Sequence, residues 1–238
     1  MKQIKTIVTG AALMLVGIAV TDATTVLREY AFNIDGVVTD TFNPPGGLTP
    51  TPEVTYGTFN AATGLGTLTL SVAALGAHSI SVFFDHDLGL VLNDETGSAP
   101  GAPGAGQSWE IDEPGYGNNV NGYRGNIWAD FNAGTLDGTV NSGGSGGAPT
   151  SLDDMAMAMG WSFTGPADIL ITLSQTAPGS GFYLRQYDAD PGGRELFLSG
   201  VLTLTTPPPA GVPEGGATLT SLMCALFGLG ALKYKVRH

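Results

Sequence analysis

The chain has 238 residues, with 21 acidic and 9 basic side chains and a formal net charge of −12 at pH 7. Nucleic acids bind proteins through Lys and Arg contacts, so a chain of this charge is not expected to bind them. The one cysteine, Cys224, lies near the C-terminus, which excludes an internal disulfide in the rest of the chain.

The first 23 residues predict a secretory signal peptide. Lys2 and Lys5 precede an apolar, uncharged stretch over residues 6–20, and small residues follow up to Ala23. This order of basic, apolar and small residues is typical of a segment that directs export and is then removed. We expect cleavage near Ala23, and the alternative is an N-terminal helix that is retained.

Residues 24–206 are predicted to form one all-β domain, an antiparallel β-sandwich. The segment is long enough to bury a sizeable core. Short runs rich in β-branched and aromatic residues alternate with Gly, Pro and Asn, which is typical of a sandwich. The predicted strands are residues 26–34, 54–59, 65–73, 79–84, 88–92, 155–163, 169–174 and 196–205.

Residues 155–163 favour a strand although their composition is typical of a helix. Met155, Met157, Met159 and Trp161 fall at every second position, and the residues between them are small. A period of two is that of a strand, because successive side chains point to opposite faces. We therefore expect a central core strand whose small face lies under a neighbouring element.

Asp85 and Asp87, with Glu95 further along the chain, form a first candidate site. Carboxylate oxygens at alternate positions suit Ca²⁺. The spacing is not that of an EF-hand loop, however. The alternative is a turn rich in Asp and Asn, which bend and cap the backbone.

Glu110 and Asp112 form a second candidate site. On a strand they project from the same face, with backbones about 7 Å apart, and paired carboxylates are the catalytic groups of glycosidases. The segment resembles the Glu-x-Asp-x-x-Glu pattern of one retaining glycosidase family. Gly115 stands at the third acidic position, where that family has its proton donor.

The C-terminal segment predicts a membrane anchor. A linker over residues 207–216 precedes an apolar run over residues 217–232, and Lys233, Lys235 and Arg237 follow it. The run is slightly short for a membrane span, which needs about 20 residues, but the basic side chains can reach the headgroups. Because Lys and Arg stay on the cytoplasmic side, we expect a transmembrane helix within residues 217–238 and an external body.

This segment resembles the PEP-CTERM sorting signal of bacteria, in its Val-Pro-Glu-Gly-Gly variant. The matching residues are Val212, Pro213, Glu214, Gly215 and Gly216. The resemblance implies processing by exosortase, a membrane protease-transpeptidase. Residues 83–87, 108–115 and 157–163 also resemble blocks of secreted PEP-CTERM proteins whose function is not assigned.

Together these features predict a non-catalytic secreted protein of the cell surface or of the exopolysaccharide matrix. The chain has no Gly-x-Ser-x-Gly nucleophile motif, and residues 24–206 contain no cysteine. We expect no cofactor other than Ca²⁺. The alternatives are a secreted carbohydrate-active hydrolase and a Ca²⁺-dependent carbohydrate-binding module.

Overall fold

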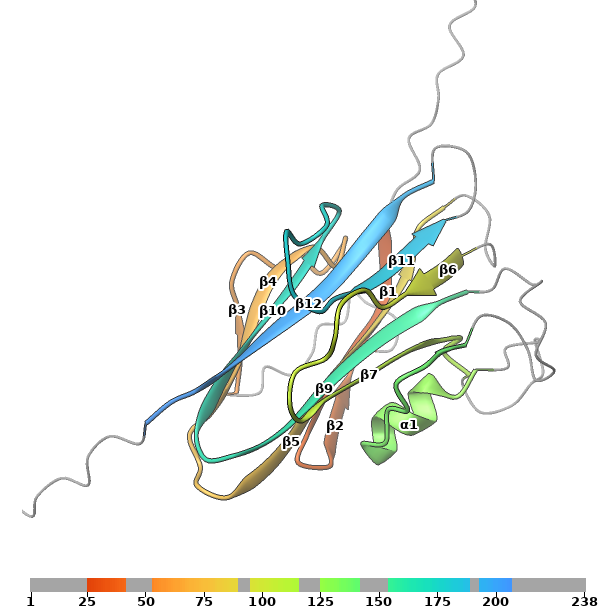
Figure 1. The fold of residues 1–238 in the computed structure, drawn as a ribbon. Coiled ribbons are helices and arrows are strands. Elements are labelled where there is room, and N and C mark those ends of the chain that lie inside the picture. Colours follow the sequence, from red (N-terminus) through yellow and green to blue (C-terminus); the bar gives the residue numbers. More distant parts are fainter. Residues whose placement is uncertain are drawn as a thin grey trace, which may run out of the picture.

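A computed structural model describes residues 25–41, 53–89, 95–115, 125–141, 154–188 and 193–206. Within these ranges the fold is all-β, with two six-stranded sheets packed together and one short helix, α1 (Ile127–Ala133) (Figure 1). This confirms the predicted all-β class and its two antiparallel sheets. The predicted signal peptide, sorting signature and anchor lie outside the described residues. No helix in the described part of the chain is long and apolar enough to cross a membrane.

Both sheets are antiparallel throughout, except for the parallel pair β7 and β8. The first sheet runs in the order β2 (Val37–Asp40), β1 (Val26–Ile34), β5 (Ala77–Asp87), β9 (Ala156–Thr164), β7 (Gln107–Asp112) and β8 (Val140–Asn141). The second runs in the order β3 (Val54–Tyr56), β4 (Gly66–Val72), β10 (Ala167–Ser174), β12 (Glu195–Leu204), β11 (Leu184–Asp188) and β6 (Glu95–Ser98).

The main core lies between the two sheets. Each strand sends every second side chain inward, as strand geometry requires. The first sheet contributes Phe32, Phe84 and Ile111, and the second contributes Leu70 and Ile171; all five are fully buried. Burial of this apolar surface is the principal stabilising contribution to the fold.

Strand β9 is the predicted central core strand, and it lies between β5 and β7. Met155, Met157, Met159 and Trp161 all belong to the core between the sheets. Ala156 and Ala158 belong to a second cluster on the opposite face, under α1. The small residues are required there because the helix lies close to that face.

Helix α1 covers the outward face of the first sheet and was not predicted from the sequence. Ile127 and Phe131 of the helix pack against Phe83 of β5 and the alanines of β9. The side chain of Asn33 donates to the Phe131 carbonyl at 2.8 Å, which ties the last turn to β1. Gly134 ends the helix in the left-handed region, with φ of 70°.

The predicted strand over residues 88–92 is not present at residues 88 and 89, the part of it that is described. Strand β5 instead continues to Asp87. Its extension is stabilised by pairing with β1 through Val26 and with β9 through Ala156. Residues 90–92 lie outside the described ranges.

Candidate functional site

The outward face of the first sheet gathers acidic side chains where α1 covers it. Glu110 and Asp112 of β7 pair with Ala158 and Ala156 of β9, so they lie on the face that the helix covers. Ile111, between them, points into the main core. The two carboxylates thus share one face, as strand alternation predicts.

Asp112 is engaged by backbone groups of the segment that leads into α1. One of its oxygens accepts from the Glu113 amide at 2.8 Å, and the other accepts from the Asn126 amide at 2.9 Å. Asn126 is the residue that precedes the helix. Asp112 therefore positions α1 on the sheet.

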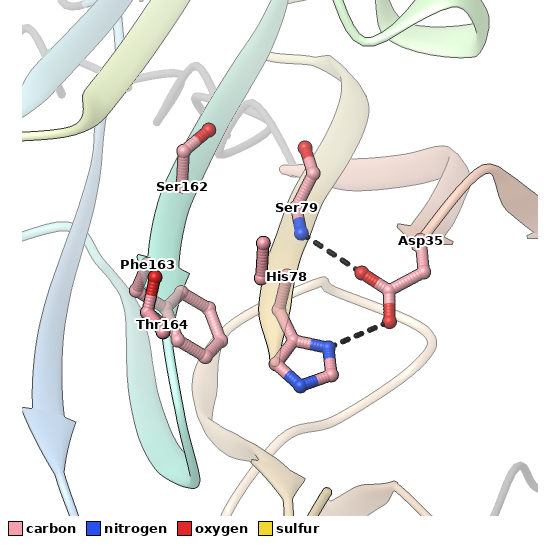
Figure 2. Close-up of a pocket in the computed structure, with 7 residues that line it drawn as sticks. Asp35, His78, Ser79, Ser162, Phe163 and Thr164 are labelled. Atoms are coloured by element: carbon pink, nitrogen blue, oxygen red, sulfur yellow. Dashed lines mark hydrogen bonds and ion pairs between the residues drawn. The ribbon is translucent and has the colours of Figure 1, made fainter. Parts of the chain in front are cut away.

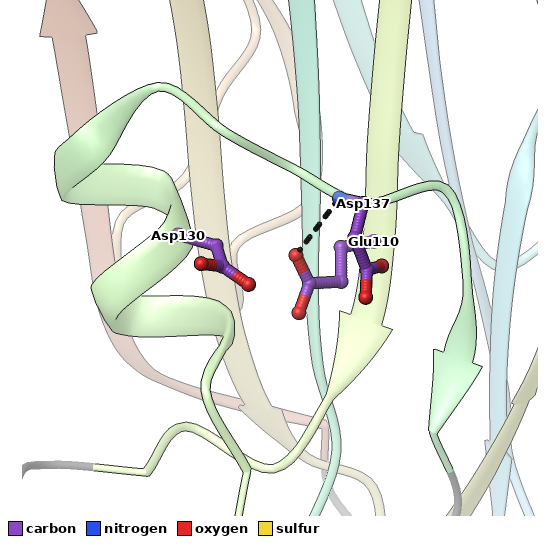
Figure 3. Close-up of side chains that lie close together, drawn as sticks. All are labelled: Glu110, Asp130 and Asp137. Atoms are coloured by element: carbon purple, nitrogen blue, oxygen red, sulfur yellow. Dashed lines mark hydrogen bonds between the residues drawn. The ribbon is translucent and has the colours of Figure 1, made fainter.

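Glu110 meets two further carboxylates, those of Asp130 and Asp137. Asp130 comes from α1 and Asp137 from the loop between α1 and β8, and Figure 3 shows the three side chains together. One oxygen from each lies within 4.8 Å of the others. Among the described residues this is the one group of three acidic, His or Cys side chains that converges so closely.

The two partners of Glu110 are held by local hydrogen bonds. Oδ1 of Asp137 accepts from the amide of Thr139 at 3.0 Å and from its hydroxyl at 2.6 Å. Asp130 accepts from the side chains of Asn126 and Thr135. Both carboxylates are therefore fixed in position, and that of Asp137 lies in an exposed loop.

Glu110 itself is fully buried, and its carboxyl is poorly satisfied. Oε2 accepts one long hydrogen bond, of 3.4 Å, from the Asp137 amide, and the buried Oε1 has no hydrogen-bond partner in the described part of the chain. Burial, followed by the charges of Asp137 and Asp130, raises the pKa of Glu110 to about 8. The carboxyl is therefore protonated over much of the neutral range unless a cation replaces the proton.

This arrangement differs from that of a glycosidase acid pair. A catalytic acid must reach the oxygen that it protonates, whereas α1 and its following loop cover Glu110. Asp112 is occupied by two backbone amides. Neither carboxylate is open to a sugar in this structure.

The predicted Ca²⁺ set, Asp85, Asp87 and Glu95, is not brought together. Asp85 and Asp87 lie on β5 with the same alternation as Phe83, which places them on the outward face of the first sheet. Asp87 forms an ion pair with Arg28. Glu95 belongs to β6 in the second sheet. The three are not a convergent ligand set, because Asp85 and Asp87 face outward from the first sheet, whereas the Glu95 carboxylate lies between the sheets, against the amides of Leu88 and Met155.

Glu95 has a structural position instead. Its carboxylate accepts from the Leu88 amide at 2.7 Å, from the Met155 amide at 3.2 Å and from the Gln186 side chain. These contacts join the end of β5, the residue before β9, and β11. Burial raises the pKa of Glu95 to about 8, although the hydrogen bonds oppose the rise.

A surface pocket of about 740 Å³ lies near the turn between β1 and β2 (Figure 2). His78 lines it, with Nδ1 2.8 Å from Asp35 Oδ2 and Nε2 3.2 Å from the Ala74 carbonyl. The hydrogen bond that His78 donates to the Asp35 carboxylate raises the pKa of His78. Because both ring nitrogens already face acceptors, neither is placed to take a proton from a nucleophile.

Asp130 and Asp137 were missed by sequence reasoning. Twenty or more positions separate them from Glu110, and only the placement of α1 over β7 brings the three together. No sequence pattern links these three positions.

Comparisons with known proteins add no assignment. No family model, no curated protein and no solved structure matched this chain.

Proposed function

We propose that the protein is a secreted, non-catalytic component of the cell surface or of the exopolysaccharide around it. The observation that carries the non-catalytic part is the position of Glu110 and Asp112, which are buried under α1. The pair that most resembles catalytic acids is thus used to hold a helix on a sheet. In the pocket at His78, the His78 ring likewise is not placed as a general base, because both of its nitrogens face acceptors.

Export and sorting rest on the two ends of the sequence. The signal peptide over residues 1–23 leads the chain out of the cytoplasm, and the apolar run with its basic end holds it briefly in the membrane. An exosortase-type protease then cuts near Pro213 or Glu214. The body, residues 24–206, is left in the cell envelope, on the surface or in the matrix.

The outward face of the second sheet is the surface that we assign to exopolysaccharide contact. Strands β4, β10 and β12 present hydroxyl groups there, including Ser71 and Thr203, beside the exposed side chains of Leu170 and Val201. Leu170 and Val201 are directly opposite each other in the sheet. Hydroxyl groups beside small apolar patches suit a sugar, which has both polar edges and apolar faces.

The test is a glycan array probed with the mature protein purified from the surface of the producing cells, alongside an assay for released sugar. We expect binding without turnover, and a Val201→Asp change should weaken the binding. Asp40→Asn, on the other sheet, is the control variant. Release of sugar that Glu110→Gln abolishes would establish a hydrolase instead.

A further inference from the structure

We propose that Glu110, Asp130 and Asp137 bind a calcium ion that fastens α1 and its following loop to β7. This inference does not depend on the proposed function. The three carboxylates come from three different elements, and one oxygen of each lies within 4.8 Å of the others. Three oxygens at this spacing surround a point that is at most about 2.8 Å from each of them, close to the Ca–O distance of about 2.3–2.6 Å, so a small side-chain adjustment lets one ion touch all three.

The second observation is the unsatisfied carboxyl of Glu110. A buried polar atom without a partner is costly, and native proteins rarely leave one. Oε1 of Glu110 is such an atom, on a side chain with no exposed surface, and it belongs to the group that meets Asp130 and Asp137. A cation at this point supplies the missing partner.

The charge at the site is high, with three carboxylates gathered together. The ion pairs of Arg28, His78 and Arg185 are made with Asp87, Asp35 and Glu195, which do not belong to this cluster. Three carboxylates in contact repel one another, and a divalent cation neutralises two of the charges.

The donor set selects the kind of metal. All three side chains offer oxygen, and no His or Cys belongs to the group. Oxygen ligands suit Ca²⁺, which takes 6–8 of them in flexible geometry, whereas zinc sites favour nitrogen and sulfur. Water and the second carboxylate oxygens complete the shell. Asp137 is exposed, so the ion has a path from solvent.

A bound calcium ion strengthens the attachment of α1 to the first sheet. Helix α1 has seven residues, and so short a helix depends on tertiary contacts for its stability. Its attachments include the packing of Ile127 and Phe131, the bond from Asn33, and the bond from the Asn126 amide to Asp112. An ion shared by Asp130, Asp137 and Glu110 links the helix, the loop and the strand directly. On an extracellular protein, this makes the attachment of the helix dependent on the calcium outside the cell.

The test is a calcium titration of the purified full-length protein, followed by calorimetry and by the thermal unfolding midpoint. We expect saturable binding and a midpoint that rises with calcium, because an ion that binds only the folded state stabilises it. Asp137→Asn should weaken the affinity about tenfold or more, since it removes one charged ligand. Asp137 is exposed, so this variant is expected to fold.

Asp168→Asn is the matched control, because Asp168 is an acidic residue on the second sheet that hydrogen bonds to Ser71. It should leave the affinity unchanged. Terbium, which replaces calcium and is sensitised by nearby tryptophan, gives a site-specific readout. Trp109 precedes Glu110 in the sequence. Its indole also lies close to Gly138, the residue after Asp137: a Cβ built on Gly138 would be 3.9 Å from Trp109 Nε1.

The proposal is overturned if wild type binds no calcium, or if Asp137→Asn and Asp130→Asn bind it as tightly as wild type does. Terbium luminescence that persists in both variants would place the ion elsewhere. Failure of this test leaves the proposed surface function untouched, because that function is measured by glycan binding and processing.

Discussion

Successive side chains of β9 point to opposite faces of the first sheet and belong to different packing clusters. Met157 is fully buried in the core between the sheets, directly opposite Phe84 of β5. Ala158, the next residue, lies in the cluster under α1. A change at either position therefore acts on a different packing layer.

Met157→Asp should unfold the protein or lower its free energy of unfolding by at least about 3 kcal/mol, because it buries a charge without a partner. Met157→Leu, which conserves volume, should cost less than about 1.5 kcal/mol. Chemical denaturation monitored by circular dichroism measures both. Equal stability of the Asp variant and wild type would mean that this face of β9 is not in the core.

The stability of the protein should fall as the pH rises from about 5 to 8. Glu95, with a pKa raised from 4.5 to about 8 chiefly by burial and further by Asp154, keeps its proton in the folded state and loses it on unfolding. Glu110, whose pKa is raised to about 8 by burial and further by the charges of Asp137 and Asp130, behaves in the same way. The folded state therefore binds more protons in this window, and each group lowers stability by up to about 1.4 kcal/mol per pH unit.

His86 acts in the opposite direction at lower pH. Burial lowers its pKa to about 3, so unfolding below pH 6.5 takes up a proton and stability falls as the pH drops. Above pH 6.5, His86 is neutral in both the folded and the unfolded state, so of these three groups only Glu95 and Glu110 still make the stability depend on pH. Glu95→Gln should make the slope between pH 6.5 and 8 shallower in calcium-free buffer. An unchanged slope in denaturation curves would show that Glu95 titrates normally.

At this scale, the sequence indicated which carboxylates share a face but not which ones meet. Glu110 and Asp112 could be placed on one side of a strand by alternation alone. The meeting of Glu110 with Asp130 and Asp137 requires a helix to fold back over the sheet, and no periodic pattern specifies that contact. Asp85, Asp87 and Glu95 were grouped by closeness in sequence, although their strands belong to different sheets.

At the scale of elements, the end of α1 is the point most sensitive to backbone geometry. Gly134 has φ of 70°, and a Cβ built there would meet no atom within 4 Å. Gly179 is equally open but has no positive φ. The two positions thus differ in conformation and not in available space.

Gly134→Ala should therefore destabilise the protein by about 1 kcal/mol through the left-handed backbone alone. Gly179→Ala should be neutral or slightly stabilising, since it reduces the freedom of the unfolded chain. Paired thermal unfolding curves measure the difference. If both variants have the same midpoint, the end of α1 does not adopt this conformation.

Strands β9, β10 and β12 were predicted close to their observed bounds, whereas β2 and β6 were not predicted. Strands β9, β10 and β12 each have at least eight residues and carry a clear period of two. Strands β2 and β6 have four residues each, too few for alternation to distinguish a strand from a loop. Helix α1 spans only about two turns, so a helical period had no room to become visible.

At the scale of the whole molecule, an acidic all-β body with few basic side chains is consistent with a protein that works outside the cell. The sandwich class followed from many short strands separated by turn residues. The order of strands within each sheet could not be predicted, because it depends on long-range pairing such as β1 with β5 and β4 with β10.

The central claim is that the protein is exported and sorted through its C-terminal signal. Intact-mass measurement of the form isolated from the surface of producing cells tests it most directly. The proposed route predicts a chain that begins near residue 24 and ends near Pro213 or Glu214, and a Glu214→Ala change should leave the tail uncut. A surface form that still carries residues 217–238 would contradict sorting and establish a permanent membrane anchor.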